Sequence, residues 1–397
     1  MRGSIPKVVF FHVHAPDSIG GNTTYLVNTV KYLSRRLNGL DIVLPTGQLR
    51  LEGTDLRFHY YPFDRLKLPV GVRYFHFLGR LIQLYVNSGR VLRRLDPDVI
   101  ISNHSMAMLV SYLVARRAKR IFLPGSLRAM DMKMDAPRPP KNIIKKWLGS
   151  INPWGGKVFE KMALRVSDKT VVNTNFLEKL IAGIYGQKYT ERVKIIPNGV
   201  DLERYGEMQA ASIKSNGEKR IALSAFRMMP SKNWRLIMDA CPYLGPEIEW
   251  WIAGDGPDLD ELKTVISNRN LDGKLKALGA RNDMAALYRL ADLFVHPSMY
   301  DNYPTVVMEA SVSGLPVILL DPDTPGSFTG NAELMKRIPE CVTAKDTGED
   351  MAKAINSVLA DMPPKEKIAM ESRELNDHKH HVEALLALIQ DELKSGN

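Results

Sequence analysis

The sequence predicts an α/β protein built from two doubly wound parallel-sheet domains, and three observations carry this prediction. The chain has 397 residues, whereas a single hydrophobic core rarely grows beyond about 250–300 residues. Short β-rich runs alternate with longer amphipathic runs, which favours parallel sheets covered by helices on both faces. The alternation stops at a polar, aperiodic stretch, residues 207–218, and then starts again.

In the first half, short runs rich in β-forming residues are expected to be strands. Longer runs between several of them carry apolar residues at three- and four-residue spacing, the pattern of an amphipathic helix. The predicted strands are Val8–His12, Asp41–Leu44, Arg57–Tyr60, Val99–Ser102, Arg120–Leu123, Lys169–Val172 and Val193–Ile196. The predicted helices are Thr23–Leu37, Phe75–Leu95, Met106–Arg117, Gly156–Val166 and Phe176–Ile184.

The second half repeats the pattern after the turn signal at residues 197–199 and the polar stretch that follows it. We therefore place one domain at residues 1–205 and the other at residues 206–376. In such domains ligands bind beyond the carboxyl ends of the strands, so the cleft between the two is the expected site. The predicted strands are Arg220–Ser224, Glu249–Ala253, Leu275–Leu278, Leu293–His296 and Pro316–Leu320; the predicted helices are Leu236–Leu244, Leu259–Arg269, Met284–Leu290 and Val306–Ser313.

The C-terminal segment, roughly Lys365–Lys394, is charged and helical in pattern. It contains His378, His380 and His381 in the run DHKHH. On a helix this spacing turns one of the three imidazoles away, and no Cys or carboxylate triad accompanies them. We therefore expect a solvated helix start here and no metal site.

Composition and charge narrow the function classes. Hydrophobic residues make up 45% and charged residues 25% of the chain, which excludes fibrous, disulfide-dense and disordered classes. The formal net charge is +10, but residues 1–200 carry 32 basic and 13 acidic side chains (+19), which leaves −9 for the remainder. The basic surplus suggests that a polyanion, an anionic substrate or a membrane surface faces the first half.

The ends and the cysteines point to a cytoplasmic protein. The N-terminus has only a short apolar run, followed by His and Asp and by no small-residue cleavage site, so we expect no secretory signal. The longest apolar uncharged stretch, Val99–Ala115, is interrupted by polar residues, so we expect no transmembrane helix. Cys241 and Cys341 are 100 positions apart without a CxxC motif, which indicates two thiols in a reducing compartment.

The most informative motif runs from His296 to Ile318 and predicts a strand end, a polar loop and a helix that begins near Pro304. Two carboxylates, Asp301 and Glu309, lie eight positions apart across the loop and helix. Free N–H groups at the helix start attract anions, so a phosphate could bind there between the two acids. The alternative is a capping Asp and one surface Glu.

A second motif, Ser224–Trp234, places Arg227 and Lys232 after a predicted strand. Two such cations can converge on one diphosphate, although solvated surface charges would look the same. The run AGDGP, Ala253–Pro257, permits close backbone approach, but a plain tight turn is the commoner explanation. The chain has no GxGxxG after its first strand and no P-loop Gly-Lys-Ser/Thr, so dehydrogenase and NTPase interpretations lose their main support.

Two further candidates lie in the first half. The turn Gly20-Gly21-Asn22 follows the first strand and could approach a phosphate or a sugar through its N–H groups. His104 follows the strand Val99–Ser102 and precedes a helix, at the same carboxyl edge. A turn required by geometry and a structural histidine are the alternatives.

Taken together, these segments resemble the retaining glycosyltransferases of family 4, which have the GT-B fold of two Rossmann-like domains facing a cleft. The resemblance covers nearly the whole chain. It implies transfer of a sugar from a nucleotide-diphosphate sugar, UDP- or GDP-linked, to a hydroxyl acceptor with retained anomeric configuration and no required metal or cofactor. It rests on the Gly20-Gly21 turn, His104 after DVIISN, and the runs VVNTNFLEKL, IPNGVD, FRMMPSKNW, AGDGP, LGARNDMAALYRLADLFVHPS and DNYPTVVMEASVSGLPVI.

The resemblance also implies roles for individual residues. Arg227 and Lys232 would hold the donor diphosphate and stabilise the charge that grows on it. Asp301 would contact the transferred sugar, and His104 would lie near that sugar and the acceptor. Glu309 would hydrogen-bond the ribose hydroxyls. The other implied donor-binding residues are Gly21, Gly254, Asp255, Arg281, Asn302, Tyr303, Pro304 and Thr305.

Two positions depart from the family's usual motif. Many members have Glu where this chain has Asp301, which is one methylene shorter, so the grip on the sugar or the donor preference can differ. Many have Phe-Gly where this chain has Tyr303-Pro304, and Pro304 offers no N–H. Similar Tyr/Phe-Pro forms occur among members that build cell-surface polysaccharides.

In this architecture the first domain, joined by the C-terminal residues 377–397, receives the acceptor, so the basic half is the acceptor half. Its segment Lys141–Lys157 mixes lysines with Ile, Leu and Trp, as in chains that lie at anionic membrane surfaces. We therefore expect a peripheral enzyme on the cytoplasmic face of the membrane that acts on a lipid-linked or other anionic glycan. A solvated basic face is the alternative.

Two other functions are compatible with parts of the sequence. A nucleotide-sugar epimerase or a non-catalytic nucleotide-sugar binder of the same fold would share the donor motifs. A nucleic-acid-binding protein would explain the basic half, but it would not explain the carboxylates and cations at the strand ends of the acidic half, so we expect no nucleic-acid partner.

Overall fold

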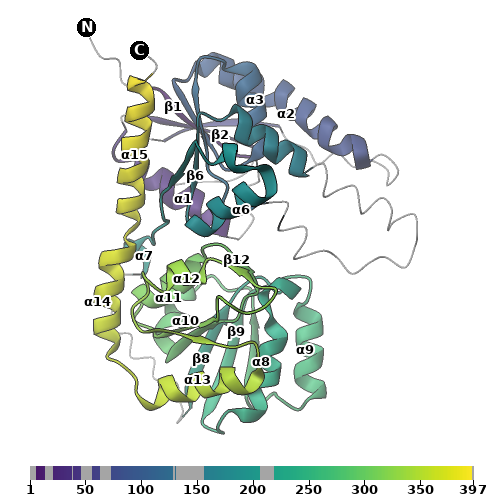
Figure 1. Cartoon of the computed structure of the whole chain (residues 1–397), viewed down its shortest axis with the longest axis vertical. Helices are drawn as coiled ribbons and strands as arrows, with labels where there is room; N and C mark the ends of the chain where they lie inside the picture. Colours follow the sequence, from purple (N-terminus) through teal and green to yellow (C-terminus); the bar gives the residue numbers. More distant parts are fainter. Residues whose placement is uncertain are drawn as a thin grey trace. The chain divides into compact units, whose positions relative to one another are not determined.

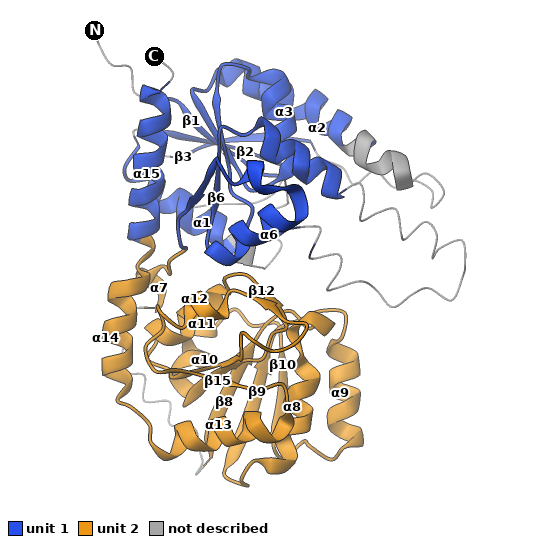
Figure 2. Ribbon diagram, in the orientation of Figure 1, with its two compact units in different colours: residues 1–197, 379–397 blue, residues 198–378 orange. Residues whose placement is uncertain are grey.

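The computed structural model describes residues 6–13, 21–37, 39–45, 56–62, 73–127, 130, 156–205 and 219–395. The chain divides into two units (Figure 2): residues 1–197 with 379–397 form the first, and residues 198–378 form the second. Each unit is an α/β layer structure around its own parallel sheet, which confirms the predicted fold class (Figure 1). The polar stretch 207–218 and most of the basic segment, residues 141–155, lie outside the described residues.

The sheet of the first unit has seven strands in the order β3-β2-β1-β4-β5-β6-β7, and every pair in it is parallel. The strand order reverses between the neighbours β1 and β4, so this unit has a topological switch point there. The strands are β1 (Val8–Phe11), β2 (Leu40–Pro45), β3 (Leu56–Tyr61), β4 (Val99–Ser102), β5 (Lys119–Phe122), β6 (Lys169–Val172) and β7 (Val193–Ile195).

Helices cover both faces of this sheet because its strands are apolar on both sides (Figure 1). On one face, α1 and α15 pack apolar side chains against alternate strand residues. On the other, α2 and α3 lie side by side. The helices of this unit are α1 (Gly21–Ser34), α2 (Arg73–Leu95), α3 (Ser105–Val114), a helix over 156–166, α6 (Asn175–Tyr185), the 3₁₀ turn η2 (Gln187–Tyr189) and α15 (His378–Lys394).

The sheet of the second unit has six parallel strands in the order β10-β9-β8-β11-β13-β15. Its order reverses between β8 and β11. A two-stranded ladder, β12 with β14, lies outside this sheet. The strands are β8 (Arg220–Ala225), β9 (Ile248–Ala253), β10 (Leu275–Gly279), β11 (Leu293–His296), β12 (Tyr300–Asp301), β13 (Val317–Leu320), β14 (Phe328–Thr329) and β15 (Cys341–Ala344).

Two apolar clusters fill the faces of the second sheet. One lies under α8, α9 and α13, and the other under α7, α10, α11 and α12. The helices are α7 (Leu202–Tyr205), the 3₁₀ turn η3 (Pro230–Lys232), α8 (Trp234–Ala240), the 3₁₀ turn η4 (Cys241–Tyr243), α9 (Leu259–Asn268), α10 (Met284–Leu290), α11 (Thr305–Val312), α12 (Asn331–Leu334), α13 (Gly348–Ala360) and α14 (Lys365–Asn376).

The expectation of a solvated helix start at DHKHH is wrong. The segment is two helices, α14 and α15, and it breaks at Asp377. His378 and His381 are buried. Within the second unit, His378 Nδ1 lies 3.3 Å from the carbonyl oxygen of Gly199. Within the first, His381 Nδ1 lies 3.0 Å from the carbonyl oxygen of Pro197. Burial lowers the pKa of His381 to about 4, so its imidazole is neutral and structural.

Candidate functional site

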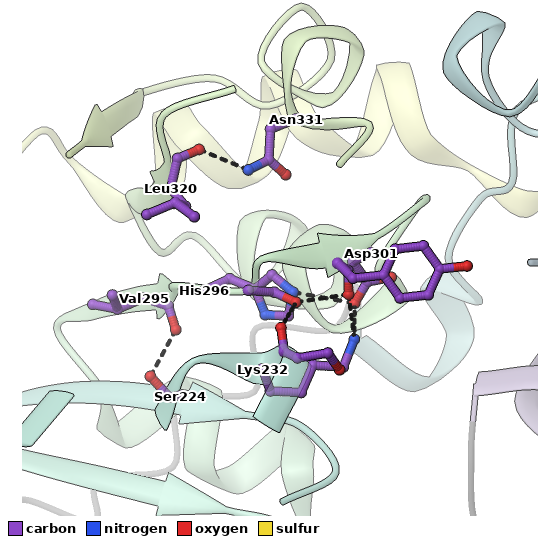
Figure 3. Close-up of polar contacts among 10 residues, drawn as sticks. Ser224, Lys232, Val295, His296, Asp301, Leu320 and Asn331 are labelled. Carbon is purple, nitrogen blue, oxygen red and sulfur yellow. Dashed lines mark hydrogen bonds and ion pairs between the residues drawn. The ribbon is translucent and has the colours of Figure 1, made fainter. Parts of the chain in front are cut away.

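The carboxyl edge of the second sheet gathers most of the predicted site residues. The order of this sheet reverses between β8 and β11, and α/β proteins commonly bind ligands beyond the carboxyl ends of the strands at such a switch point. The hydroxyl of Ser224 on β8 donates to the carbonyl oxygen of Val295 on β11 at 2.6 Å, just before both strands end (Figure 3). This bond ties the two strands together below the site.

Two glycines of the AGDGP run allow the loops after β8 and β9 to touch. Gly254 has φ +135°, and a Cβ there would lie 1.9 Å from the carbonyl oxygen of Phe226. A Cβ at Gly256 would lie 2.4 Å from the carbonyl oxygen of Met228. In return, the amide of Met228 donates to the carbonyl oxygen of Asp255 at 3.0 Å. The two glycines are therefore required for close packing of the two loop backbones. This packing fixes the backbone on both sides of Arg227, which lies between Phe226 and Met228.

Arg227 is exposed although both of its neighbours are buried. Among the described residues, its guanidinium makes no ion pair or hydrogen bond. A cation at a sheet's carboxyl edge that has no partner among the described residues is suited to an anionic ligand.

Lys232, Asp301 and His296 form a cluster at the same carboxyl edge of the sheet (Figure 3). Lys232 ends η3, Asp301 ends β12 and His296 ends β11. Lys232 Nζ lies 2.7 Å from Asp301 Oδ2 and donates to the carbonyl oxygen of Tyr300 at 3.0 Å. His296 Nε2 lies 3.2 Å from the same Asp301 Oδ2. The structure therefore brings together two predicted residues, Lys232 and Asp301, and adds one that the sequence did not single out, His296.

The electrostatics of this cluster keep Asp301 ionised. Burial acts to raise the pKa of Asp301, but Lys232 and His296 outweigh it and hold that pKa well below its ordinary value. Burial lowers the pKa of His296, so its imidazole is neutral at pH 7 despite the adjacent carboxylate. Lys232 has three N–H groups and uses two of them here, which leaves one for a ligand.

Glu309 is buried on α11, so the alternative of a surface Glu is wrong. The hydroxyl of Tyr288 on α10 donates to Glu309 Oε2 at 3.0 Å. Burial raises the pKa of Glu309, and the hydrogen bonds from Tyr288 and Tyr205 oppose this shift. The two tyrosine rings meet edge to face at 5.9 Å. Neither tyrosine was predicted: Tyr288 lies in a predicted helix whose pattern indicates only a core position, and Tyr205 lies outside every predicted helix and strand.

The loop that joins Asp301 to α11 is largely buried. Asn302 and Tyr303 are 4% and 6% exposed, and burial raises the pKa of Tyr303 to about 12. Pro304 precedes the helix and Thr305 is its first residue; no side chain caps this helix start. The first amides of α11 are therefore not engaged by a capping side chain, as a phosphate site at this helix start would require.

Two predicted donor-binding residues have their polar groups engaged within the protein. The guanidinium of Arg281 forms two hydrogen bonds with Asp283, at 2.8 and 2.5 Å, on the exposed surface before α10. The carboxylate of Asp255 accepts the amide of Gly256 at 2.7 Å. Both contacts are local, and both residues lie in loops at the carboxyl edge of the sheet.

Gly21 and His104 belong to the first unit and lie at its own switch point. Gly21 begins α1, which follows β1. His104 is buried and caps α3, because its Nδ1 accepts the amide of Met106 at 3.2 Å. Beside it, His12 Nδ1 lies 3.1 Å from Asn103 Oδ1, which links the ends of β1 and β4. His104 therefore has a structural task, whatever further role it has.

Over the described residues, no group of three or more His, Cys, Asp or Glu side chains is placed to hold a metal ion. Within the same residues, no helix is both long enough and apolar enough to cross a bilayer.

Both halves of the chain match known protein families. Residues 19–204 match the family described as Glycosyltransferase Family 4, and residues 207–375 match the one described as Glycosyl transferases group 1. Together the two matches cover nearly the whole chain. The chain belongs to these GT-B glycosyltransferases. In this glycosyltransferase, the group 1 match contains Arg227, Lys232, Asp301 and Glu309, and the family 4 match contains Gly21 and His104.

Two curated relatives are similar to parts of this glycosyltransferase. The UDP-Gal:alpha-D-GlcNAc-diphosphoundecaprenol alpha-1,3-galactosyltransferase of Escherichia coli is 31% identical over 269 residues, which are 64% of this chain and 63% of that protein. The lipopolysaccharide core biosynthesis glycosyltransferase LpsE of Rhizobium meliloti is 22% identical over 53% of this chain and 59% of its own length. The matched regions thus span less than two thirds of these relatives.

Solved structures share the fold over nearly the whole chain. HepE of Anabaena, solved with UDP and glucose, matches with a TM-score of 0.72 at 18% identity. The match covers 97% of this chain and 99% of the HepE chain. The sucrose-phosphate synthase of Thermosynechococcus elongatus has a TM-score of 0.76 at 15% identity and covers 98% and 100%. At sequence identities this low, the structural similarity shows only that the chain shares the GT-B fold.

Proposed function

We propose that this glycosyltransferase moves a sugar from a nucleotide-diphosphate sugar to a hydroxyl group of a lipid-linked or other anionic glycan, with retention, in the synthesis of a surface polysaccharide or glycolipid. The observation that carries the proposal is the placement of Arg227, which has no ion pair among the described residues, and of the ion pair between Lys232 and Asp301 beyond the strands at the switch point of the second sheet. The two cations can bind the negative charges of a diphosphate. The carboxylate can accept a hydrogen bond from a sugar hydroxyl.

The chemistry follows from these charges. The bond between the anomeric carbon and the β-phosphate oxygen breaks, and a bond to the acceptor oxygen forms on the same face of the sugar. Negative charge grows on the leaving diphosphate, where Arg227 and the remaining N–H of Lys232 stabilise it. The acceptor proton passes to the leaving phosphate. Asp301 accepts hydrogen bonds from the sugar, and Glu309, oriented by Tyr288, accepts them from the ribose.

The donor is a UDP- or GDP-sugar, and the names of similar proteins support uridine. The Escherichia coli relative is named for UDP-Gal and a diphosphoundecaprenol acceptor, and HepE was solved with UDP. The reaction needs no metal in this proposal because two protein cations meet the diphosphate. We therefore expect the rate in excess EDTA to equal the rate with Mg²⁺.

Thermal-shift screening against UDP, GDP and their common sugars tests the donor. Compounds that stabilise the protein are then assayed for slow hydrolysis, and for transfer to polyprenyl-diphosphate-linked saccharides with the product anomer read by NMR. Stabilisation by a nucleotide sugar with transfer supports the proposal. Binding without hydrolysis or transfer would favour a non-catalytic binder, and epimerised donor would favour an epimerase.

We further propose that the enzyme binds an anionic membrane surface through its basic first unit. On α2, Ile82 and Val86 are 55% and 51% exposed, and Arg90 and Arg93 are also exposed. Their spacing of four, four and three residues places them on one side of the helix, opposite its buried face. We call these four residues the α2 stripe. The whole of α2 contains no acidic residue.

The neighbouring helix extends the same kind of surface. A Cβ at Gly89 of α2 would lie 3.3 Å from Val114 Cγ2 of α3, so the two helices are in close contact. On α3, Tyr112 and Leu113 are each 47% exposed, and exposed arginines follow at 116 and 117. Apolar side chains with flanking arginines and no acids complement an anionic lipid surface.

Vesicle flotation tests the membrane proposal. Arg90→Glu with Arg93→Glu should reduce binding to vesicles containing phosphatidylglycerol by more than about tenfold at low salt, since each basic residue near such a surface contributes about 1 kcal/mol. Lys345→Glu with Lys353→Glu, exposed charges of the second unit, is the matched control. Equal binding of both double variants would overturn the assignment of this surface.

A further inference from the structure

His296 is the last residue of β11 and has no role in the function described so far. Its side chain is 1% exposed, and its Nε2 lies 3.2 Å from Asp301 Oδ2 (Figure 3). We infer that His296 is a positioning residue, which orients the carboxylate of Asp301 so that one of its oxygens points to the transferred sugar. The inference rests on the proposed function and deepens its sugar-binding step.

The two carboxylate oxygens of Asp301 have different surroundings. A carboxylate only accepts hydrogen bonds, so the proton between the two groups is on His296 Nε2. Lys232 and His296 both donate to Oδ2. Among the described residues, nothing is bonded to Oδ1. Two donors thus fix one oxygen from two directions and leave the other to accept from a sugar hydroxyl.

The imidazole ring of His296 is held between two aromatic rings. The ring of His296 is parallel to that of Phe294 at 6.5 Å and meets Phe226 edge to face at 6.4 Å. A buried ring at a strand end, held by two aromatic neighbours, has one orientation. Lys232 stabilises the charge of Asp301 through a flexible side chain, whereas the ring of His296 fixes the direction of its hydrogen bond to that carboxylate.

The stability of the fold does not account for a histidine at position 296. Its Nδ1 is buried and, within the described part of the chain, has no hydrogen-bond partner. An unpaired buried nitrogen is unfavourable, and a leucine of similar volume would avoid it. A histidine at this place therefore indicates a task that its other nitrogen performs.

Two variants separate positioning from packing. His296→Leu removes the donor, and His296→Gln keeps an N–H donor of similar reach. The nucleoside diphosphate and nucleotide sugar selected by the thermal-shift screen serve as probes in calorimetry. For His296→Leu we expect unchanged affinity for the nucleoside diphosphate, roughly tenfold weaker binding of the nucleotide sugar and about 10–100-fold lower kcat. The thermal stability of His296→Leu should not fall. His296→Gln should recover both the binding of the nucleotide sugar and kcat.

A double-mutant cycle adds a readout that does not depend on packing. In an Asp301→Asn background, His296→Leu should cause no further loss of nucleotide-sugar binding, because its effect passes through Asp301. An equal loss of diphosphate and nucleotide-sugar binding, or a full additional loss in the Asp301→Asn background, would overturn the inference. If the wild type binds no nucleotide sugar, the proposed function fails first, and the inference falls with it.

Discussion

At the scale of residues, the two cations Arg227 and Lys232 lie close in sequence but in different surroundings. Lys232 is 17% exposed and shares its charge with Asp301 at 2.7 Å. Arg227 is exposed and, among the described residues, shares its charge with none. A bound diphosphate would therefore receive the full charge of Arg227 but only part of the charge of Lys232.

This difference makes Arg227 the sharper test of the donor site. Arg227→Ala should lower kcat by more than about 100-fold, the size expected when one charge-stabilising contact is lost. Steady-state kinetics with the native donor measure it. Arg289→Ala, at an exposed arginine on α10 of the same unit, is the matched control and should keep the wild-type rate. Similar rates in both variants would contradict the assigned role of Arg227.

Glu309 gives a prediction with a defined pH direction. Burial raises its pKa, so the folded state holds the proton more tightly than the unfolded state. The contribution of Glu309 to the free energy of unfolding is therefore greatest below the unfolded pKa of about 4.3 and is lost as the pH rises through the folded pKa.

Glu309→Gln removes this ionisation, so its Tm relative to the wild type should rise as the pH increases from about 4 to 7. Binding of the nucleotide should weaken in the same variant, because the amide is a poorer acceptor for the ribose hydroxyls. Thermal scans across this pH range measure the first effect. Glu366→Gln, at an exposed glutamate of α14, should show no such trend; a flat difference for Glu309→Gln would refute the argument.

Residue types at strand ends could be predicted from the sequence, but their partners could not. Asp301 and Glu309 are predicted because two carboxylates lie on either side of a predicted helix start, and Lys232 is predicted because it follows a strand together with Arg227. The pairing of Lys232 with Asp301 joins residues 69 positions apart, and Tyr288 reaches Glu309 from another helix. His296 and Tyr288 escaped prediction because, in sequence, they look like core residues of a strand and a helix.

At the scale of elements, the loops after β8 and β9 depend on close backbone contact. Gly254→Ala would put a Cβ 1.9 Å from the carbonyl oxygen of Phe226, at a φ of +135° that side chains rarely adopt. One loop must move, and Arg227 moves with it.

We therefore expect Gly254→Ala to weaken nucleotide binding by more than about tenfold and to destabilise the second unit by several kcal/mol, through both steric overlap and backbone strain. Isothermal calorimetry and urea denaturation measure the two effects. Gly273→Ala is the matched control, because a Cβ at Gly273 would meet no atom within 4 Å. A Gly254→Ala protein that binds and unfolds like Gly273→Ala would refute the role of this contact.

Most predicted elements are present because their hydrophobic periodicity is local. Val99–Ser102, Lys169–Val172, Leu293–His296 and Met284–Leu290 have the predicted bounds. The strand β15 and the helix α13 were not predicted, and neither was the small ladder of β12 with β14. A two-residue ladder has too few side chains to show any period, and it exists because Tyr300 pairs with Phe328 across the fold.

At the scale of the whole molecule, the last helix completes the core of the first unit. Val382, Leu385, Leu388 and Ile389 of α15 lie in one apolar cluster with strand residues such as Val8. His381 also reaches Tyr25 of α1, whose hydroxyl lies 2.8 Å from its Nε2. The unit that begins the chain is therefore closed by the residues that end it.

Leu385→Ala should accordingly destabilise the first unit by about 2–5 kcal/mol, the usual cost of emptying a buried leucine site. Hydrogen exchange followed by mass spectrometry can assign the loss of protection to β1 and α1 rather than to β8 and β9. Leu375→Ala, at a leucine of α14 that is 42% exposed, should change little. Loss of protection confined to the second unit would contradict the placement of α15.

The sequence by itself determined the fold class, the order of most strands and helices, and the charged residues available at the strand ends. These properties follow from local composition and periodicity, which each segment carries alone. The tertiary structure decided which charges are neutralised, which glycines are needed for close contact, and that His378 and His381 are buried. Those facts arise where distant segments meet, because burial and pairing depend on neighbours up to 356 positions away, and no local pattern contains them.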